Sequence, residues 1–172
     1  MYVVAFVLTT APARILKNSC WRTDDIPVPC SQHIINCTAD IADNASPDFT
    51  WRRVPLEDHP AENIFRAFAP ACAIIAAARE AGGATLVHCR KGMSRSATIA
   101  LAFCVSHERM TLLEALRRLR AQRPSVSPNA GFMAQLLDLE HGVHGCTTVD
   151  LIKVRRALVW TCCFKCLCRR CH

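Results

Sequence analysis

The stretch that decides the fold is VHCRKGMSRS, residues 87–96. The apolar run from Ala84 to Val87 predicts a buried strand, and the apolar sequence that follows Ser96 predicts a helix. A strand that passes through a short loop into a helix directs successive backbone N–H groups into a concave nest, and the helix N-terminus adds a partial positive charge. The sequence therefore predicts a phosphate-sized anion site between a strand and a helix.

Two side chains bracket this loop and suit one kind of chemistry. Cys89 and Arg95 are separated by five residues, and an arginine guanidinium holds two phosphate oxygens in a bidentate fork. Gly92 allows the backbone to approach the anion closely. A thiolate at Cys89, stabilised by the same positive field, would be a nucleophile directed at phosphorus. A lone cysteine at a strand end is usually a small core residue, so the prediction depends on the conjunction of these features.

Longer segments carry a family resemblance. HCRKGMSRSAT resembles the signature loop of the cysteine-dependent phosphatases, and its Ser-Arg-Ser ending resembles the dual-specificity branch. VPLEDHPAENI, AGGATLVHC and AQRPSVSPNAGFMAQLLDLE are similar to segments of the small atypical dual-specificity protein phosphatases. The resemblance extends from His33 to Gly145. It implies hydrolysis of phosphotyrosine and of phosphoserine or phosphothreonine in proteins through a phosphocysteine intermediate.

The resemblance also assigns a general acid and a hydroxyl. Asp58 lies 31 residues before Cys89, and VPLED matches the general-acid loop of the family. From composition alone, an aspartate at this place is usually a helix cap or first-turn acid. Ser96 is implied to donate a hydrogen bond to the thiolate that departs when water breaks the phosphocysteine.

The remaining candidate residues have supporting roles. His88 is expected to order the loop and to help keep Cys89 ionised through hydrogen bonds. Ser94 is expected to support the shape of the loop, and Asn129 to brace it from behind. No metal ligands accompany His88 nearby in the sequence, and the predicted reaction needs no metal or other cofactor. The phosphate-binding loop is completed by Arg90, Lys91, Gly92 and Met93.

Two alternatives remain open for the function. Arg90 and Lys91 add positive charge within the loop, which would also suit a polyanionic substrate such as a phosphoinositide, another lipid phosphate or an RNA 5′-phosphate. An alternative of a different class is a non-catalytic pseudophosphatase that binds phosphopeptides. The nucleophile, arginine, acid and hydroxyl are all present, which favours the enzyme.

Length and charge indicate one near-neutral domain with a basic tail. The chain has 172 residues and a net charge of +7, which is room for a single core without a second module. Residues 153–172 hold six basic and no acidic side chains, whereas residues 1–152 hold 15 basic and 14 acidic ones. The near-neutral body argues against a nucleic-acid-binding face, and the family resemblance implies phosphoproteins as its partners.

The twelve cysteines do not form the pattern of a disulfide framework. Cys37, Cys72, Cys89 and Cys104 each stand alone within apolar strand-like or helical patterns, where free buried thiols are common. A thiolate nucleophile also requires a reducing compartment. We therefore expect the protein in the cytoplasm or the nucleus.

Along the chain, strands and helices alternate, which predicts an α/β fold with a small, mostly parallel central sheet flanked by helices. Residues 1–32 are expected to be an atypical segment with an edge strand over residues 1–13 and a loop over 14–32; a signal peptide is the weaker interpretation of its start. Residues 33–145 are the predicted catalytic domain and 146–172 the basic Cys-rich tail. Within the domain, strands are expected at 33–38, 50–56 and 84–87, and helices at 61–81, 97–107, 112–122 and 129–140.

The tail, residues 162–172, has three competing interpretations. Its cysteines lie beside Lys and Arg, so S-acylation would provide the two signals that membrane anchoring requires. A Cys/His cluster would instead bind zinc, although the spacing lacks paired knuckles. The third interpretation is sequence read past a splice junction.

Overall fold

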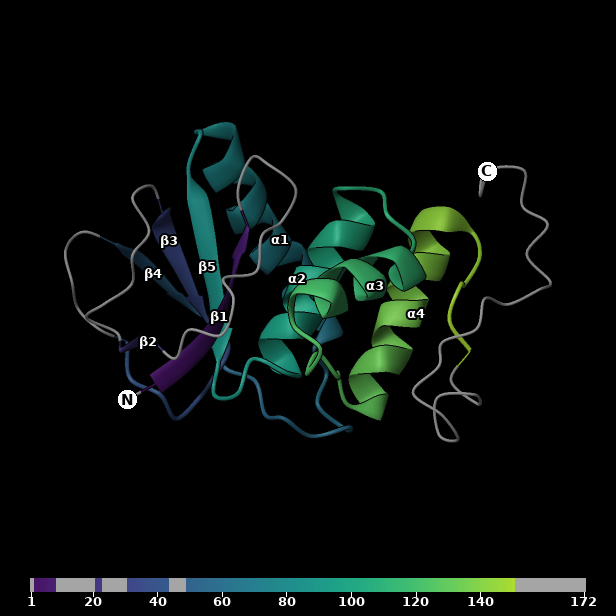
Figure 1. The fold of residues 1–172 in the computed structure, drawn as a ribbon, viewed down its shortest axis with the longest axis horizontal. Coiled ribbons are helices and arrows are strands. Elements are labelled where there is room, and N and C mark those ends of the chain that lie inside the picture. The colour runs from purple at the N-terminus through teal and green to yellow at the C-terminus, as the bar shows by residue number, and fades with distance from the viewer. Residues whose placement is uncertain (1, 9–20, 23–30, 44–48, 151–172) are drawn as a thin grey trace.

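The computed structural model describes residues 2–8, 21–22, 31–43 and 49–150 of the chain (Figure 1). Within these residues four strands are followed by α1, the central strand β5 and then three successive helices. The strands are β1 Tyr2–Leu8, β2 Trp21–Arg22, β3 Ser31–Asn36, β4 Thr50–Arg53 and β5 Ala84–Cys89, and the helices are α1 Phe65–Glu80, α2 Arg95–Ser106, α3 Leu112–Gln122 and α4 Ala130–His144.

The strands form a mixed sheet in the order β2-β1-β5-β3-β4. Its core is parallel, because β3 pairs with both β4 and β5 in parallel. β1 pairs with the other side of β5 in the antiparallel direction, and β2 pairs with β1 in the same way. β5 is therefore flanked by strands on both sides, and every side chain from Ala84 to Cys89 is buried. The predicted α/β architecture with its parallel sheet core is confirmed.

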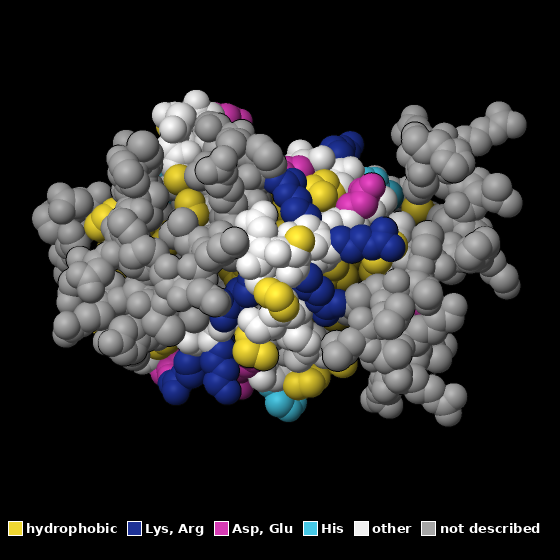
Figure 2. Space-filling view, in the orientation of Figure 1, with side chains coloured by type: hydrophobic (Ala, Val, Ile, Leu, Met, Phe, Trp, Pro, Cys, Tyr) yellow, Lys and Arg dark blue, Asp and Glu magenta, His cyan; other side chains and the backbone are white. Residues whose placement is uncertain are grey.

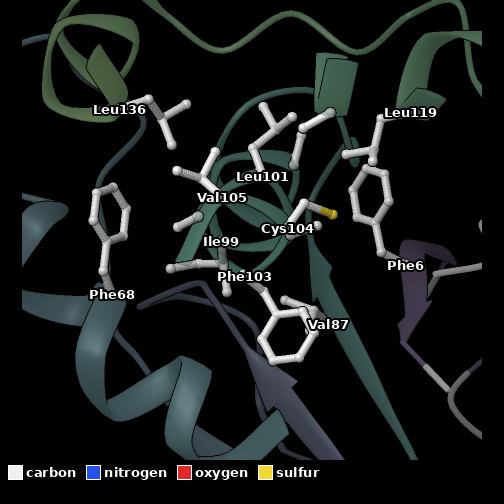
Figure 3. Packing of buried hydrophobic residues seen from close by; sticks show 14 of the residues in the cluster. Phe6, Phe68, Val87, Ile99, Leu101, Phe103, Cys104, Val105, Leu119 and Leu136 are labelled. Atoms are coloured by element: carbon white, nitrogen blue, oxygen red, sulfur yellow. The ribbon is translucent and has the colours of Figure 1, made fainter. Parts of the chain in front are cut away.

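The main hydrophobic core lies between the sheet and the helices. Helix α2 lies against β5 and β1 and also contacts α1, α3 and α4, which explains why eleven of its twelve residues are buried. The close-up in Figure 3 shows side chains from the sheet and from several helices meeting around α2. Because each fully buried apolar side chain contributes about 1.5–3 kcal/mol, this packing fixes α2 relative to β5. The labelled members are Phe6, Phe68, Val87, Ile99, Leu101, Phe103, Cys104, Val105, Leu119 and Leu136.

Two helix boundaries differ from the prediction by four residues, and α2 covers Arg95–Ser106 rather than 97–107. Helix α1 begins at Phe65 rather than near residue 61, because the side chain of Gln135 on α4 accepts from Phe65 N at 2.7 Å and donates to Glu62 O at 2.9 Å, ending the preceding turns there. Helix α4 continues past residue 140 to His144, and the following Gly145 takes the left-handed conformation at φ 73° and ends the helix. Helix α3 begins with a capping box, in which the Thr111 side chain accepts from Glu114 N and the Glu114 side chain accepts from Thr111 N.

The N-terminal segment is partly as predicted. The strand expected near the start is confirmed as β1, but it is not an edge strand, because it pairs with β2 on one side and β5 on the other. The loop expected over residues 14–32 is wrong at Trp21–Arg22 and Ser31, which belong to β2 and β3. The strand predicted over 50–56 ends at Arg53, just before Pro55, which has no N–H to donate. The tail from residue 151 lies outside the described residues. Among the described helices, none is both long and apolar enough to cross a membrane.

Candidate functional site

The signature loop, residues 89–96, surrounds the Cys89 thiol with hydrogen-bond donors. Cys89 is the last residue of β5 and only 2% exposed. Its Sγ atom accepts from Gly92 N at 3.3 Å and lies 3.1 Å from Ser96 Oγ. Gly92 has a φ of 61°, a conformation that favours glycine because it has no Cβ. The loop thus brings a backbone N–H and a hydroxyl to the sulfur, an arrangement that stabilises a thiolate.

Arg95 opens α2 and directs a buried guanidinium toward the same site. Its side chain is fixed by one hydrogen bond, in which Nη1 donates to Leu56 O at 3.1 Å. Its Nε atom is buried and has no hydrogen-bond partner among the described residues. The arrangement leaves a desolvated cationic donor available, which binds an anion strongly.

Asp58 lies beside that guanidinium although it precedes Arg95 by 37 positions. Asp58 Oδ2 is 3.8 Å from Arg95 Nε, and Asp58 Oδ1 accepts from Asn129 Nδ2 at 3.2 Å. Asn129 also donates its backbone N–H to Ser94 Oγ at 3.3 Å. Asn129 therefore touches both the carboxylate and the signature loop. The predicted bracing by Asn129 and the predicted structural role of Ser94 agree with these contacts.

A close backbone approach, which the sequence did not predict, sets the position of the Asp58 loop. Gly131, in the first turn of α4, lies so near Pro60 that an added Cβ would be 1.8 Å from the Pro60 carbonyl oxygen. Only glycine allows this contact. Gly131 thus lets the loop that carries Asp58 lie against the N-terminal turn of α4.

The prediction for His88 is wrong. Successive side chains of a strand point to opposite faces, so His88 faces away from Cys89 and lies edge-on to Trp51 at a ring-centroid distance of 6.2 Å. Neither ring nitrogen has a hydrogen-bond partner among the described residues, and burial lowers the pKa of His88 to about 4. His88 is therefore a neutral buried ring that makes no described hydrogen bond to the loop.

A second thiol, Cys37, packs beside Cys89. In the parallel register Asn36 pairs with His88, and Cys37 N donates to His88 O at 2.9 Å, which places Cys37 next to Cys89 on the helix-facing side. Burial raises the pKa of Cys37 well above its ordinary value, and the neighbouring Cys89 raises it further. Cys37 thus stays a neutral thiol. Cys37, Cys72, Cys89 and Cys104 are free and buried, as predicted.

The rim of the signature loop carries exposed basic and apolar side chains. Arg90 forms an ion pair with Asp40, and the hydrogen bond from Arg90 lowers the pKa of Asp40. Lys91 is exposed, and Met93 is one of two large apolar side chains exposed in the described residues. In Figure 2 the basic side chains of the visible face lie in several groups, some beside acidic ones, rather than in one continuous patch.

The assembled site contains a thiol, a guanidinium, a carboxylate and a hydroxyl around one concave loop. Within the described residues, no group of three or more His, Cys, Asp or Glu side chains is gathered in a way that would hold a metal ion. The four groups can bind a tetrahedral oxyanion, attack its central atom and exchange a proton with a departing oxygen.

Comparison with known proteins gives consistent matches to one family. The family model described as "Dual specificity phosphatase, catalytic domain" matches residues 30–142. Human dual specificity protein phosphatase 14 is 37% identical over 126 residues, which are 73% of this chain and 64% of that protein. Human dual specificity phosphatase 28 is 39% identical over 98 residues, 57% of this chain and 56% of that protein.

Solved structures extend the likeness to three dimensions. The crystal structure of human DUSP28 matches with a TM-score of 0.64 and 33% identity, over 67% of this chain and 80% of that one. The chain spans 64% of the length of the human phosphatase 14 it matches.

Proposed function

Because the chain belongs to the dual specificity phosphatase family, we propose that it is an enzyme that hydrolyses phosphate esters of proteins, on tyrosine and on serine or threonine, through a phosphocysteine intermediate. One observation carries this proposal. The Cys89 thiol, the buried Arg95 guanidinium and the Asp58 carboxylate come from three separate parts of the fold to one loop.

The first step forms a covalent intermediate. The Cys89 thiolate attacks phosphorus in line, while Arg95 and the backbone N–H groups of the loop hold the phosphoryl oxygens. A bond forms between sulfur and phosphorus, and the bond from phosphorus to the ester oxygen breaks. Asp58 donates its proton to that oxygen, so the product leaves as a neutral hydroxyl compound.

The second step regenerates the enzyme. Asp58, now ionised, takes a proton from a water molecule that attacks the phosphocysteine, and inorganic phosphate is released. The electron pair of the sulfur–phosphorus bond returns to Cys89, and Ser96 Oγ, 3.1 Å from Sγ, donates a hydrogen bond to the emerging thiolate. This contact supports the role that the family resemblance implies for Ser96.

The ion pair of Arg90 bears on the class of substrate. A preference for polyanionic lipid or RNA phosphates depended on free positive charge at Arg90 and Lys91. Asp40 already forms an ion pair with Arg90, so this arginine has an acidic partner within the protein, which favours phosphoproteins. Replacement of Arg90 and Lys91 by Ala tests this: a selective loss of phosphoinositide turnover, with phosphopeptide turnover retained, would contradict the phosphoprotein assignment.

Hydrolysis of 4-nitrophenyl phosphate and of peptides carrying phosphotyrosine, phosphoserine or phosphothreonine tests the proposal. We expect turnover by the wild type, none by Cys89→Ser, and reduced turnover by Asp58→Asn. Cys146→Ser, the same change at a thiol that lies after α4, should keep full activity and is the matched control. A folded wild type no faster than Cys89→Ser would overturn the assignment.

A further inference from the structure

A basic side chain outside the predicted site reaches the back of the signature loop. Arg123 follows α3, and its guanidinium donates from Nη2 to Lys91 O at 3.0 Å and from Nε to Gly92 O at 3.2 Å. Four residues further on, Ser127 donates its backbone N–H to Met93 O at 2.9 Å. Three successive carbonyl groups of the loop are therefore held from one side by residues 123–127.

The direction of these carbonyl groups sets the direction of the loop's N–H groups. The described peptide bonds are trans, and in a trans peptide the C=O and the following N–H point in opposite directions. Holding the carbonyls of residues 91, 92 and 93 therefore turns the N–H groups of residues 92, 93 and 94 to the other side. The first of them confirms the direction, because Gly92 N donates to Cys89 Sγ at 3.3 Å.

The side chain of Arg123 is not required for the local fold around it. The end of α3 is made by the backbone of Arg123, whose N–H donates to Leu119 O, and its carbonyl accepts from Val126 N. Both bonds survive any substitution of the side chain except proline. No ion pair formed by the described residues involves Arg123. Its charge is therefore directed at the loop.

We propose that Arg123 is a positioning residue for oxyanion binding: its guanidinium holds two loop carbonyls outward so that the loop's N–H groups converge on the phosphoryl oxygens. A phosphoryl group bound to the N–H side of these peptides polarises them, which strengthens the hydrogen bonds between their carbonyl groups and the Arg123 guanidinium. Arg123 therefore strengthens anion binding through the loop without touching the anion. Its effect on turnover rests on the proposed function, whereas its effect on oxyanion binding does not.

Equilibrium binding of inorganic tungstate, a tetrahedral oxyanion, tests the inference by calorimetry alongside kcat and KM for 4-nitrophenyl phosphate. Each charge-assisted hydrogen bond is worth about a factor of ten in affinity, so Arg123→Gln should raise the tungstate Kd by about ten- to a hundredfold and lower kcat/KM by a similar factor. Arg117→Gln removes the same charge from an exposed position of α3 and should change neither value.

Arg123→Lys separates charge from geometry. Lysine keeps the charge but lacks the planar fork, so we expect a tungstate Kd between those of the wild type and Arg123→Gln. Arg123→Lys also provides the test if Arg123→Gln fails to fold. A wild-type tungstate affinity in Arg123→Lys would overturn the claim that the planar guanidinium positions the loop. Equal tungstate affinity in Arg123→Gln and Arg117→Gln would overturn the inference as a whole.

The two measurements also distinguish this inference from the proposed function. A wild type that binds tungstate in an Arg123-dependent way but turns over no phosphate ester contradicts the proposed function and supports the inference. A wild type that turns over phosphate esters, with a tungstate affinity that is unchanged in Arg123→Gln, supports the proposed function and contradicts the inference.

Discussion

Gly131→Ala should damage catalysis through the Asp58 loop. The new Cβ would lie 1.8 Å from the carbonyl oxygen of Pro60, whereas real Cβ contacts stay beyond 3.0 Å. The two backbones must therefore separate by about 1.2 Å, the difference between these distances. Overpacking of this kind costs about 1–3 kcal/mol of stability, and a displacement of about 1 Å at a catalytic group costs on the order of a hundredfold in rate.

Leaving-group dependence is the assay that detects this displacement. A misplaced Asp58 matters most in the first step when the departing oxygen is basic, so kcat/KM for unsubstituted phenyl phosphate should fall far more than kcat/KM for 4-nitrophenyl phosphate. Gly142→Ala is the matched control, because that position also lies in α4 but has no atom within 4 Å of an added Cβ. This control should keep its activity and gain up to about 1 kcal/mol of stability. Wild-type turnover of both esters by a folded Gly131→Ala would refute the reasoning.

Three further predictions follow from single residues. Asn129 Oδ1 caps α4 by accepting from Phe132 N at 3.0 Å. Asn129→Ser keeps an oxygen that can cap α4 but cannot reach Asp58, so the melting temperature should be nearly unchanged while phenyl phosphate turnover falls. Asn129→Ala should lose both, and equal turnover in the wild type and the two variants would contradict the role of the amide. Glu140 is fully buried, and its carboxylate accepts from Thr148 Oγ1 at 2.6 Å and Thr148 N at 2.9 Å. Glu140→Gln should therefore lower the free energy of unfolding by about 2–3 kcal/mol, which a lower melting temperature would report, while kcat is retained. An unchanged melting temperature would contradict this prediction. The folded protein holds His88 neutral with a pKa of about 4, against an ordinary value of 6.5, whereas the unfolded chain binds a proton below about pH 6.5. The free energy of unfolding should therefore fall by up to about 3 kcal/mol as pH drops from 6.5 toward 4. In urea titrations, His88→Gln should lose most of this dependence of unfolding free energy on pH, and an identical pH dependence in both proteins would contradict the burial argument.

The part of the candidate site whose geometry can be predicted from sequence is mostly contiguous. Cys89, Ser96 and Arg95 lie within eight positions, so the strand, the loop and the helix that carry them fix their relative geometry almost by themselves. Asp58 is distant in sequence and could be assigned only through the family resemblance. Its contact with Arg95 depends on how α1 and α4 pack, which no local pattern contains.

The features that were missed or wrong have specific physical causes. The role of Arg123 could not be predicted from the sequence, because its partners are backbone carbonyl groups, which every residue carries. Gly131 resembled an ordinary helical glycine until the backbone of Pro60 was found against it. The error for His88 was avoidable: once Cys89 is directed toward the helices, the alternation of a strand requires its neighbour to face the other side of the sheet.

The N-terminal turn of α4 joins the two loops that must act together. Asn129 donates its backbone N–H to Ser94 in the signature loop and its side-chain amide to Asp58, while Gly131 contacts the backbone of Pro60. One turn of one helix therefore fixes the positions of both the signature loop and the Asp58 loop, and this helix is held in the core through Phe132 and Leu136. A general acid must lie within hydrogen-bond distance of the leaving oxygen to protonate it. A general acid on a mobile loop would occupy that position only part of the time. Anchoring both loops to the same rigid turn sets that distance through the packing of α4, which neither loop could do by itself.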